Sequence, residues 1–144
     1  MDDPDSPGGT YTLLLSLSEP VDVDVGALGT HTLAAGAYAY TGSALGSGGF
    51  ARVDRHRRIT AGEDDTRHWH VDYLTGHPAT DLVTVVTSDG VDAECRIAGR
   101  LPDGPVPGFG ASDCGCRSHL AVDVDVETLR GTVDSAHRAV RQDV

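Results

Sequence analysis

The sequence predicts a small α+β domain, in which a central antiparallel sheet is flanked by helices. Its 144 residues suffice for one domain with a modest core, and an apolar content of 39% is too high for a disordered chain. Strand-like segments fill the first part of the chain and helical segments follow later, as in α+β folds. We expect residues 1–8 to form a disordered acidic leader and residues 9–144 to form a single domain.

The first part of the chain predicts three or four strands. Residues 10–18 are apolar and β-prone, and residues 21–25, VDVDV, alternate with a period of two, as a half-buried strand does. After a turn, residues 30–42, THTLAAGAYAYTG, predict one or two further strands. We therefore expect these strands to form an antiparallel meander.

Two helices are expected next. Phe50, Val53 and Ile59 have helical spacing, which predicts a helix over residues 50–59 with arginines around the rest of its surface. Residues 64–78 begin with good capping residues and end with a glycine and a proline, so they predict a second, short helix.

The remaining chain alternates strands, helices and one long loop. The expected elements are a strand over residues 81–88, a helix over 91–101 that starts near Asp92, a loop over 102–118 rich in proline and glycine, a strand over 119–126, and an amphipathic helix from Val126 to Val140.

The charge is strongly acidic but unevenly distributed. The net charge is −11, and all 11 basic residues are arginines. An acidic surface without lysine indicates a halophilic protein, in which carboxylates maintain solubility in concentrated salt. An acidic total normally argues against nucleic-acid binding, because phosphate contacts dominate that affinity. However, five arginines gather within residues 52–67, so the local charge opposes the global charge.

The N-terminal residues indicate a cytoplasmic protein. They are acidic and lack the apolar core of a signal peptide. No apolar run in the chain is long enough to cross a membrane, so we expect no membrane partner. The sequence leaves the oligomeric state open.

A glycine-rich loop at residues 46–49 precedes the arginine-rich helix. It lacks the Gly-Lys-Ser/Thr ending of a P-loop. Backbone N–H groups at the helix start could still bind a phosphate, with Arg52 or Arg55 neutralising its charge. The alternative is an ordinary glycine-rich turn beside a solvated arginine face.

Short motifs in a fixed order connect these segments. GTY at residues 9–11 opens the first strand, and YTG at residues 40–42 ends a later one. Arg52 and His56 follow one helical turn apart, and Glu94 lies near the start of a later helix. With RHWHVDYL, AECRIAGRL and GFGASDCGCRSHL, this order resembles the GIY-YIG nuclease family, and in particular its uncharacterised prokaryotic Uri-type endonuclease branch.

The resemblance implies a role for each matching residue. Tyr11 and Tyr40 would lie beside the scissile phosphate, one of them as general base or as the group that positions the nucleophile. Arg52 would stabilise charge on the phosphate, and His56 falls where some members have a catalytic histidine. Glu94 would bind Mg²⁺ or Mn²⁺, since one carboxylate with waters and phosphate oxygens suits such ions. Tyrosine has an unperturbed pKa near 10, which the arginine and the metal would have to lower.

The resemblance also implies DNA as the partner. We expect a metal-dependent endonuclease that hydrolyses DNA phosphodiester bonds in DNA repair and selects a structure or a lesion, with a base-excision glycosylase as a candidate partner. The residues expected to contact DNA are Gly42, Ser43, Arg55, Arg58, His70 and Arg117.

Three departures from the family pattern support an alternative. The segment between Tyr11 and Tyr40 is longer than usual and holds an extra hairpin, the middle residues of the motifs are Thr10 and Thr41, and the chain has no asparagine to match one in the standard nucleases. The alternative function is a catalytically inactive nucleic-acid-binding or adaptor module on the same scaffold, stabilised in one version by zinc.

Cysteine and histidine residues suggest further metal sites, each with a plainer alternative. The candidate ligands of a structural zinc ion are Cys95, Cys114, Cys116 and His119. Their Cys-x-Cys spacing is less common than Cys-x-x-Cys, and buried thiols in a tight loop are the alternative. His68, His70 and Asp72 could form a metal triad, or they could pack around Trp69.

The two VDVDV segments each carry a pair of aspartates. Their spacing places Asp22 with Asp24, and Asp123 with Asp125, on one face of each expected strand. Calcium binding is one reading of these pairs, and a solvated acidic face is the other. We favour the solvated face because the whole chain is acidic.

Overall fold

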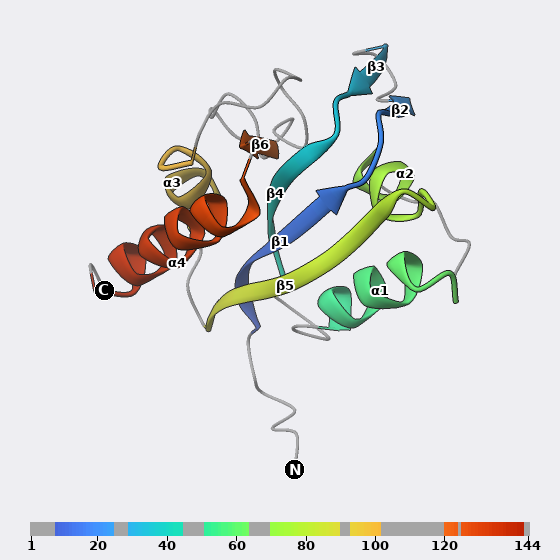
Figure 1. Ribbon diagram of the computed structural model, residues 1–144. Helices are drawn as coiled ribbons and strands as arrows, with labels where there is room; N and C mark the ends of the chain where they lie inside the picture. Colours follow the sequence, from blue (N-terminus) through green and yellow to red (C-terminus); the bar gives the residue numbers. More distant parts are fainter. Residues whose placement is uncertain are drawn as a thin grey trace.

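The structure, a computed structural model, describes residues 8–24, 29–44, 51–63, 70–89, 93–101, 120–123 and 125–142. It contains a four-stranded antiparallel sheet, a separate two-stranded hairpin and four helices (Figure 1), which confirms the predicted α+β fold. In chain order the elements are β1 (Gly9–Leu17), β2 (Val21–Asp24), β3 (Thr30–Leu33), β4 (Gly36–Ser43), α1 (Ala51–Thr60), α2 (His70–Thr75), β5 (Thr80–Asp89), α3 (Glu94–Ala98), β6 (Leu120–Asp123) and α4 (Val126–Gln142).

Strand β1 is central to the four-stranded sheet. The strand order is β5-β1-β4-β6, so β1 pairs with β4 on one side and β5 on the other. Successive side chains of a strand point to opposite faces, and both faces of β1 are covered. Leu13 and Leu15 therefore join the core on one face, and Leu14 joins the core on the other.

The first four strands form one long, bent hairpin, so the predicted meander is wrong. Leu17 of β1 pairs with Gly36 of β4, and the β2–β3 ladder then continues from Val21 paired with Leu33. Three residues separate β1 from β2, whereas two separate β3 from β4. This difference of one residue offsets the register and divides the hairpin into two ladders. Pro20 lies in the longer gap, where it has no ladder hydrogen bond to donate. The β2–β3 ladder is the extra hairpin predicted between the two tyrosine motifs.

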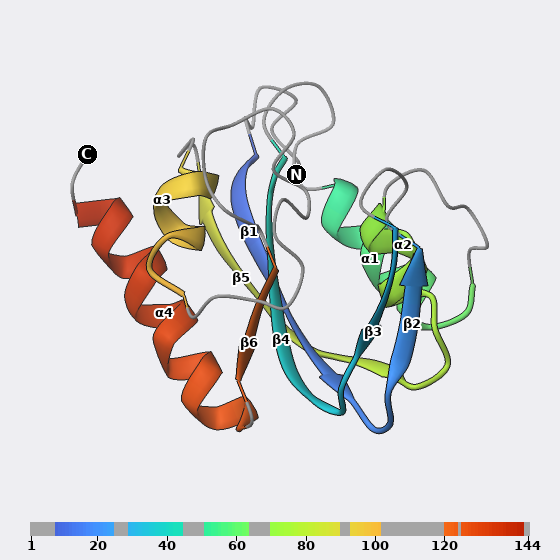
Figure 2. The ribbon, with the colours of Figure 1, turned by 90° about the horizontal axis from the view of Figure 1, so that it is seen from above.

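The sheet separates two layers of helices (Figure 2). On one face, α1, α2 and the β2–β3 hairpin pack over the sheet, and Val53, Val71 and Leu74 join the core there. On the other face, α3 and α4 cover the sheet, with Ile97, Leu129 and Val133 in the second core. The expected helices at 50–59 and 126–140 are thus confirmed to within a few residues.

The second VDVDV segment is not a single strand, which corrects the expected strand over 119–126. Strand β6 ends at Asp123, and Asp125 precedes the first turn of α4. The Asp125 carboxylate accepts hydrogen bonds from the Thr128 hydroxyl at 2.7 Å and from the Thr128 N–H at 3.3 Å. Asp125 is therefore the N-cap of α4, and the predicted pairing of Asp123 with Asp125 on one strand face is wrong.

Two further predictions concern the N-terminal residues and membrane-spanning helices. Residues 1–7 lie outside the described residues, so the acidic leader stays a prediction. Within the described ranges, none of the helices combines the length and the apolar character needed to span a membrane.

Candidate functional site

The two motif tyrosines lie on adjacent strands and on the same face of the sheet. Tyr11 of β1 is paired with Gly42 of β4, and Leu13 is paired with Tyr40. Because residues two apart on a strand share a face, Tyr11, Leu13 and Tyr40 all point toward α1. The predicted juxtaposition of the GTY and YTG motifs is therefore present.

His56 of α1 completes this group from above the sheet. Its Nε2 lies 2.9 Å from the Oη of Tyr11, and the two rings are 5.5 Å apart between centroids. Tyr40 presents an edge-on contact to the same imidazole at 6.3 Å. His56 occupies the position between Val53 and Ile59 on the buried stripe of α1, which explains why a histidine faces the core.

Gly42 allows the two phenol rings to approach each other. A Cβ at this position would lie 2.7 Å from the Oη of Tyr11 and 3.2 Å from Cε2 of Tyr40. The first distance is shorter than van der Waals contact allows, so any side chain here would displace the Tyr11 hydroxyl. The expected contact of Gly42 with DNA stays a prediction. Its role in packing follows from these two distances.

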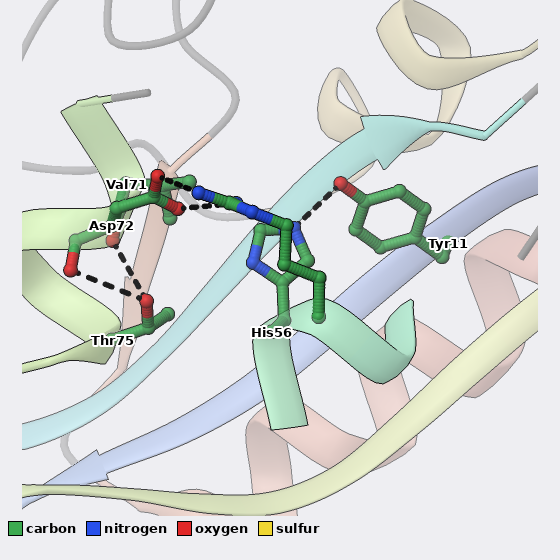
Figure 3. A network of polar contacts seen from close by, with 6 residues as sticks. Tyr11, His56, Val71, Asp72 and Thr75 are labelled. Carbon is green, nitrogen blue, oxygen red and sulfur yellow. Dashed lines mark hydrogen bonds and ion pairs between the residues drawn. The ribbon is translucent and has the colours of Figure 1, made fainter. Parts of the chain in front are cut away.

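Arg55 forms an ion pair within the protein. Its two terminal nitrogens donate to the two carboxylate oxygens of Asp72 on α2, at 3.0 and 2.7 Å (Figure 3). Asp72 is fully buried and the Arg55 side chain is 13% exposed. This pairing gives Asp72 a structural role. The considered metal triad stays untested, because His68 and the side chain of His70 lie outside the description. The predicted contact between Arg55 and DNA remains untested.

The structure places Arg52 and Glu94 through their backbones, and their side chains are outside the description. Arg52 lies one turn before His56 in α1, as expected from their spacing. Glu94 begins α3, which belongs to the layer on the opposite face of the sheet from α1 (Figure 2). The preceding Ala93 donates its N–H to Oγ1 of Thr10 at 3.0 Å, so α3 starts beside the residue that precedes Tyr11.

The remaining predicted contacts are dispersed or lie outside the description. Ser43 is half-buried at the end of β4, Arg58 is exposed on α1, and His70 begins α2 with its side chain outside the description. The side chain of Cys95 in α3 is also outside it, as are Cys114, Cys116, Arg117 and His119. Within the part of the chain that the structure describes, no three His, Cys, Asp or Glu side chains form a metal-binding group. The zinc site therefore stays a prediction.

A second buried polar network, which the sequence analysis missed, lies on the α4 side of the sheet. The two ring nitrogens of His137 lie 2.8 Å from the hydroxyls of Thr12 and Ser88, and Thr12 lies 2.9 Å from the hydroxyl of Thr41. His137 is fully buried one turn after Val133 in α4. The network explains why a polar residue stands at the centre of the YTG motif. The Thr41 hydroxyl is hydrogen-bonded to that of Thr12 on the face of the sheet opposite Tyr40.

The Tyr11–His56 pair can transfer a proton. The phenol can donate to an unprotonated Nε2, or a protonated Nε2 can donate to the phenol oxygen. Tyr11 is 3% exposed and His56 is fully buried, while Tyr40 is half-buried. The accessible part of the described site is therefore the side on which Tyr40 lies.

Comparison with known proteins places most of the chain in one family. The family model described as "Domain of unknown function DUF123" matches residues 10–142, from the first strand to the end of α4. Neither a curated protein nor a solved structure matches the chain.

Proposed function

The chain belongs to the DUF123 family, and we propose that it is a metal-dependent endonuclease that hydrolyses phosphodiester bonds of DNA. The observation that carries this proposal is the hydrogen bond between Tyr11 and His56, with Tyr40 against the same imidazole. A phenol and an imidazole in contact form a proton-transfer pair, and phosphodiester hydrolysis requires a proton to be removed from the attacking water. The order of the motifs supports the further proposal that the chain is related to the Uri-type branch of the GIY-YIG nucleases.

The chemical roles follow from the positions of the side chains. The phosphodiester approaches over Tyr40, the half-buried member of the site. His56 takes the phenol proton of Tyr11, and the phenolate takes a proton from the attacking water. As the water oxygen bonds to phosphorus, the P–O bond to the leaving sugar oxygen breaks. The leaving oxygen takes a proton from solvent, and His56 returns its proton to solvent. Arg52, one turn from His56 along α1, neutralises charge on the phosphate oxygens.

A divalent ion would be bound by Glu94, the first residue of α3. A single carboxylate, completed by water and phosphate oxygens, matches the way Mg²⁺ is usually bound. When bound, Mg²⁺ or Mn²⁺ would polarise the phosphate and stabilise developing negative charge. The chain's own contribution is to hold the start of α3 beside Thr10 and thus near the beginning of β1.

The biological setting that we propose is DNA repair. A domain of 144 residues is too small to read a long DNA sequence unaided, so we propose that it recognises a DNA structure or a lesion. A base-excision glycosylase would be a suitable partner, because it would supply the lesion that this enzyme cuts beside.

A second candidate function is a DNA-binding or adaptor module without catalytic activity. The near-complete burial of Tyr11 and His56 favours it, since a reacting phosphate must reach the phenol.

Cleavage assays separate the two functions. The purified protein is incubated with plasmid, single-stranded, branched and abasic DNA in high salt with Mg²⁺ or Mn²⁺. The endonuclease predicts cleavage that disappears in Glu94→Ala and Arg52→Ala while Glu94→Ala still binds DNA. Arg57→Ala, an exposed arginine on the same helix that is not among the expected DNA contacts, is the matched control for lost charge. Binding without cleavage of every substrate would establish the adaptor function instead.

A further inference from the structure

Two consecutive residues of α1 contact neighbouring elements in different directions. His56 points toward the sheet and contacts Tyr11 of β1, while Arg55 contacts Asp72 of α2 (Figure 3). Successive residues on a helix are about 100° apart around its axis. The two contacts therefore restrain the rotation of α1 from two sides.

The Arg55–Asp72 contact is strongly directional. Both terminal nitrogens of the guanidinium donate to separate carboxylate oxygens, at 3.0 and 2.7 Å. Such a fork-to-fork pair fixes the plane of both groups, which a lysine cannot do. The carboxylate of Asp72 has no exposed surface, so a shifted guanidinium cannot be replaced by bulk water at low cost.

The apolar contacts of α1 restrain its rotation less. Val53 and Ile59 pack in the protein interior, and contacts of this kind tolerate small rotations of the helix because they have no direction. A second ion pair of α1 joins Asp54 to Arg57 within the helix, at 3.6 Å and with both side chains exposed. That pair links α1 to no other element.

We propose that Asp72 is a positioning residue of the site. Acting through Arg55, it fixes the rotation of α1 and thereby holds Nε2 of His56 against the Tyr11 hydroxyl. The catalytic consequence rests on the proposed nuclease function, whereas the structural consequence does not. Arg55 is then an internal anchor of the helix, in contrast to the DNA contact expected from the sequence.

Nuclear magnetic resonance tests the structural consequence without any catalytic assay. The ring nitrogens of His56 are observed in protein labelled with ¹⁵N-histidine. In folded Asp72→Asn and Arg55→Lys, we expect the His56 nitrogen shifts to move away from their wild-type values as the bond to Tyr11 loosens. Asp54→Asn removes the exposed pair on the same helix and should leave them unchanged. Unchanged His56 shifts in both folded variants would overturn the proposal. Arg55→Lys retains the positive charge, so it provides the same test if Asp72→Asn does not fold.

Kinetics test the catalytic consequence. In Asp72→Asn and Arg55→Lys, kcat per folded molecule should fall by at least about tenfold while KM changes by less than about twofold, because only the reacting geometry is disturbed. An increase in KM with unchanged kcat would overturn the proposal, since it would show that Arg55 contacts DNA directly. If the wild-type protein cleaves no DNA, the nuclease function fails, and the resonance shifts still decide the role of Asp72.

Discussion

Tyr11 of β1 and His56 of α1 are 45 residues apart in the chain, yet they share a buried hydrogen bond of 2.9 Å between Oη and Nε2. Their contact links the central strand of the sheet to the first helix. A buried phenol and a buried imidazole each require a polar partner, and these two groups supply one another with it. The pair is the chemical centre of the function that we propose.

Gly42→Ala should damage the site and destabilise the protein. The new Cβ would lie 2.7 Å from the Tyr11 hydroxyl, and forcing such an overpacked contact costs on the order of 1–3 kcal/mol. The free energy of unfolding, measured by urea denaturation, should fall by this amount. Gly131→Ala on α4 is the matched control, because its Cβ has nothing within 4 Å. That control should gain about 1 kcal/mol from improved helix propensity, and an equal loss in the two variants would contradict the account.

Tyr38→Phe should lower the stability of the protein at neutral pH. At alkaline pH the variant should lose less stability than the wild type does. The Tyr38 hydroxyl donates to the Ala34 carbonyl at 2.7 Å, a bond worth about 1 kcal/mol. Burial raises the pKa of Tyr38, so its stabilising contribution is complete below the unfolded pKa of about 10 and is lost as the pH rises through the folded pKa. Unfolding measured at pH 8 and pH 11 tests both parts. If the free energies of unfolding of the wild type and the variant change in parallel with pH, the expected pH dependence is contradicted.

Asp125→Asn should weaken the start of α4. Hydrogen bonds from Thr128 and Glu127 lower the pKa of Asp125, with the Thr128 hydroxyl as the largest cause. A lowered pKa stabilises the fold above the unfolded pKa, near 4, and that contribution is lost as the pH falls through the folded pKa. The Tm difference between wild type and variant should therefore be larger at pH 7 than at pH 3. Asp134→Asn, later in the same helix, is the matched control for the change in net charge.

His137→Ala should be among the most destabilising single changes in α4. It leaves the buried hydroxyls of Thr12 and Ser88 without their imidazole partner and creates a cavity beneath the helix. The combined cost should be about 2–4 kcal/mol, against about 1 kcal/mol for Ser88→Ala, which removes one bond. Urea denaturation measures both. Equal losses in the two variants would contradict the network.

Local patterns were sufficient to predict most of the elements of the fold. The period of two in β2 and the helical spacing of Val53 and Ile59 depend on neighbouring residues, and both were confirmed. The pairing of strands was not predictable in this way. The predicted meander is wrong because β1 pairs with β4 and β5, which lie far away in the sequence. The bend of the hairpin depends on a difference of one residue between the two connections, which local patterns do not reveal.

The candidate site was predictable only where a motif signalled it. The motifs brought Tyr11, Tyr40 and Gly42 together correctly. The resemblance also pointed to His56, which lies on the apolar stripe of α1 and faces Tyr11. The pairing of Arg55 with Asp72 has no signal in the spacing, because the two residues belong to different helices. The basic segment predicts a DNA contact for Arg55, whereas the buried carboxylate that it contacts is visible only in the fold.

The most direct test of the proposed function is the single-turnover cleavage rate of Tyr11→Phe. The change removes only the hydroxyl that contacts His56. The rate on a DNA substrate cut by the wild-type protein should fall by about 10²–10⁴-fold with DNA affinity unchanged, the range expected for loss of acid–base catalysis. Tyr73→Phe, on the exposed side of α2, should cleave at the wild-type rate. A Tyr11→Phe protein that cleaves as fast as the wild type would contradict the assignment of the reaction to this pair.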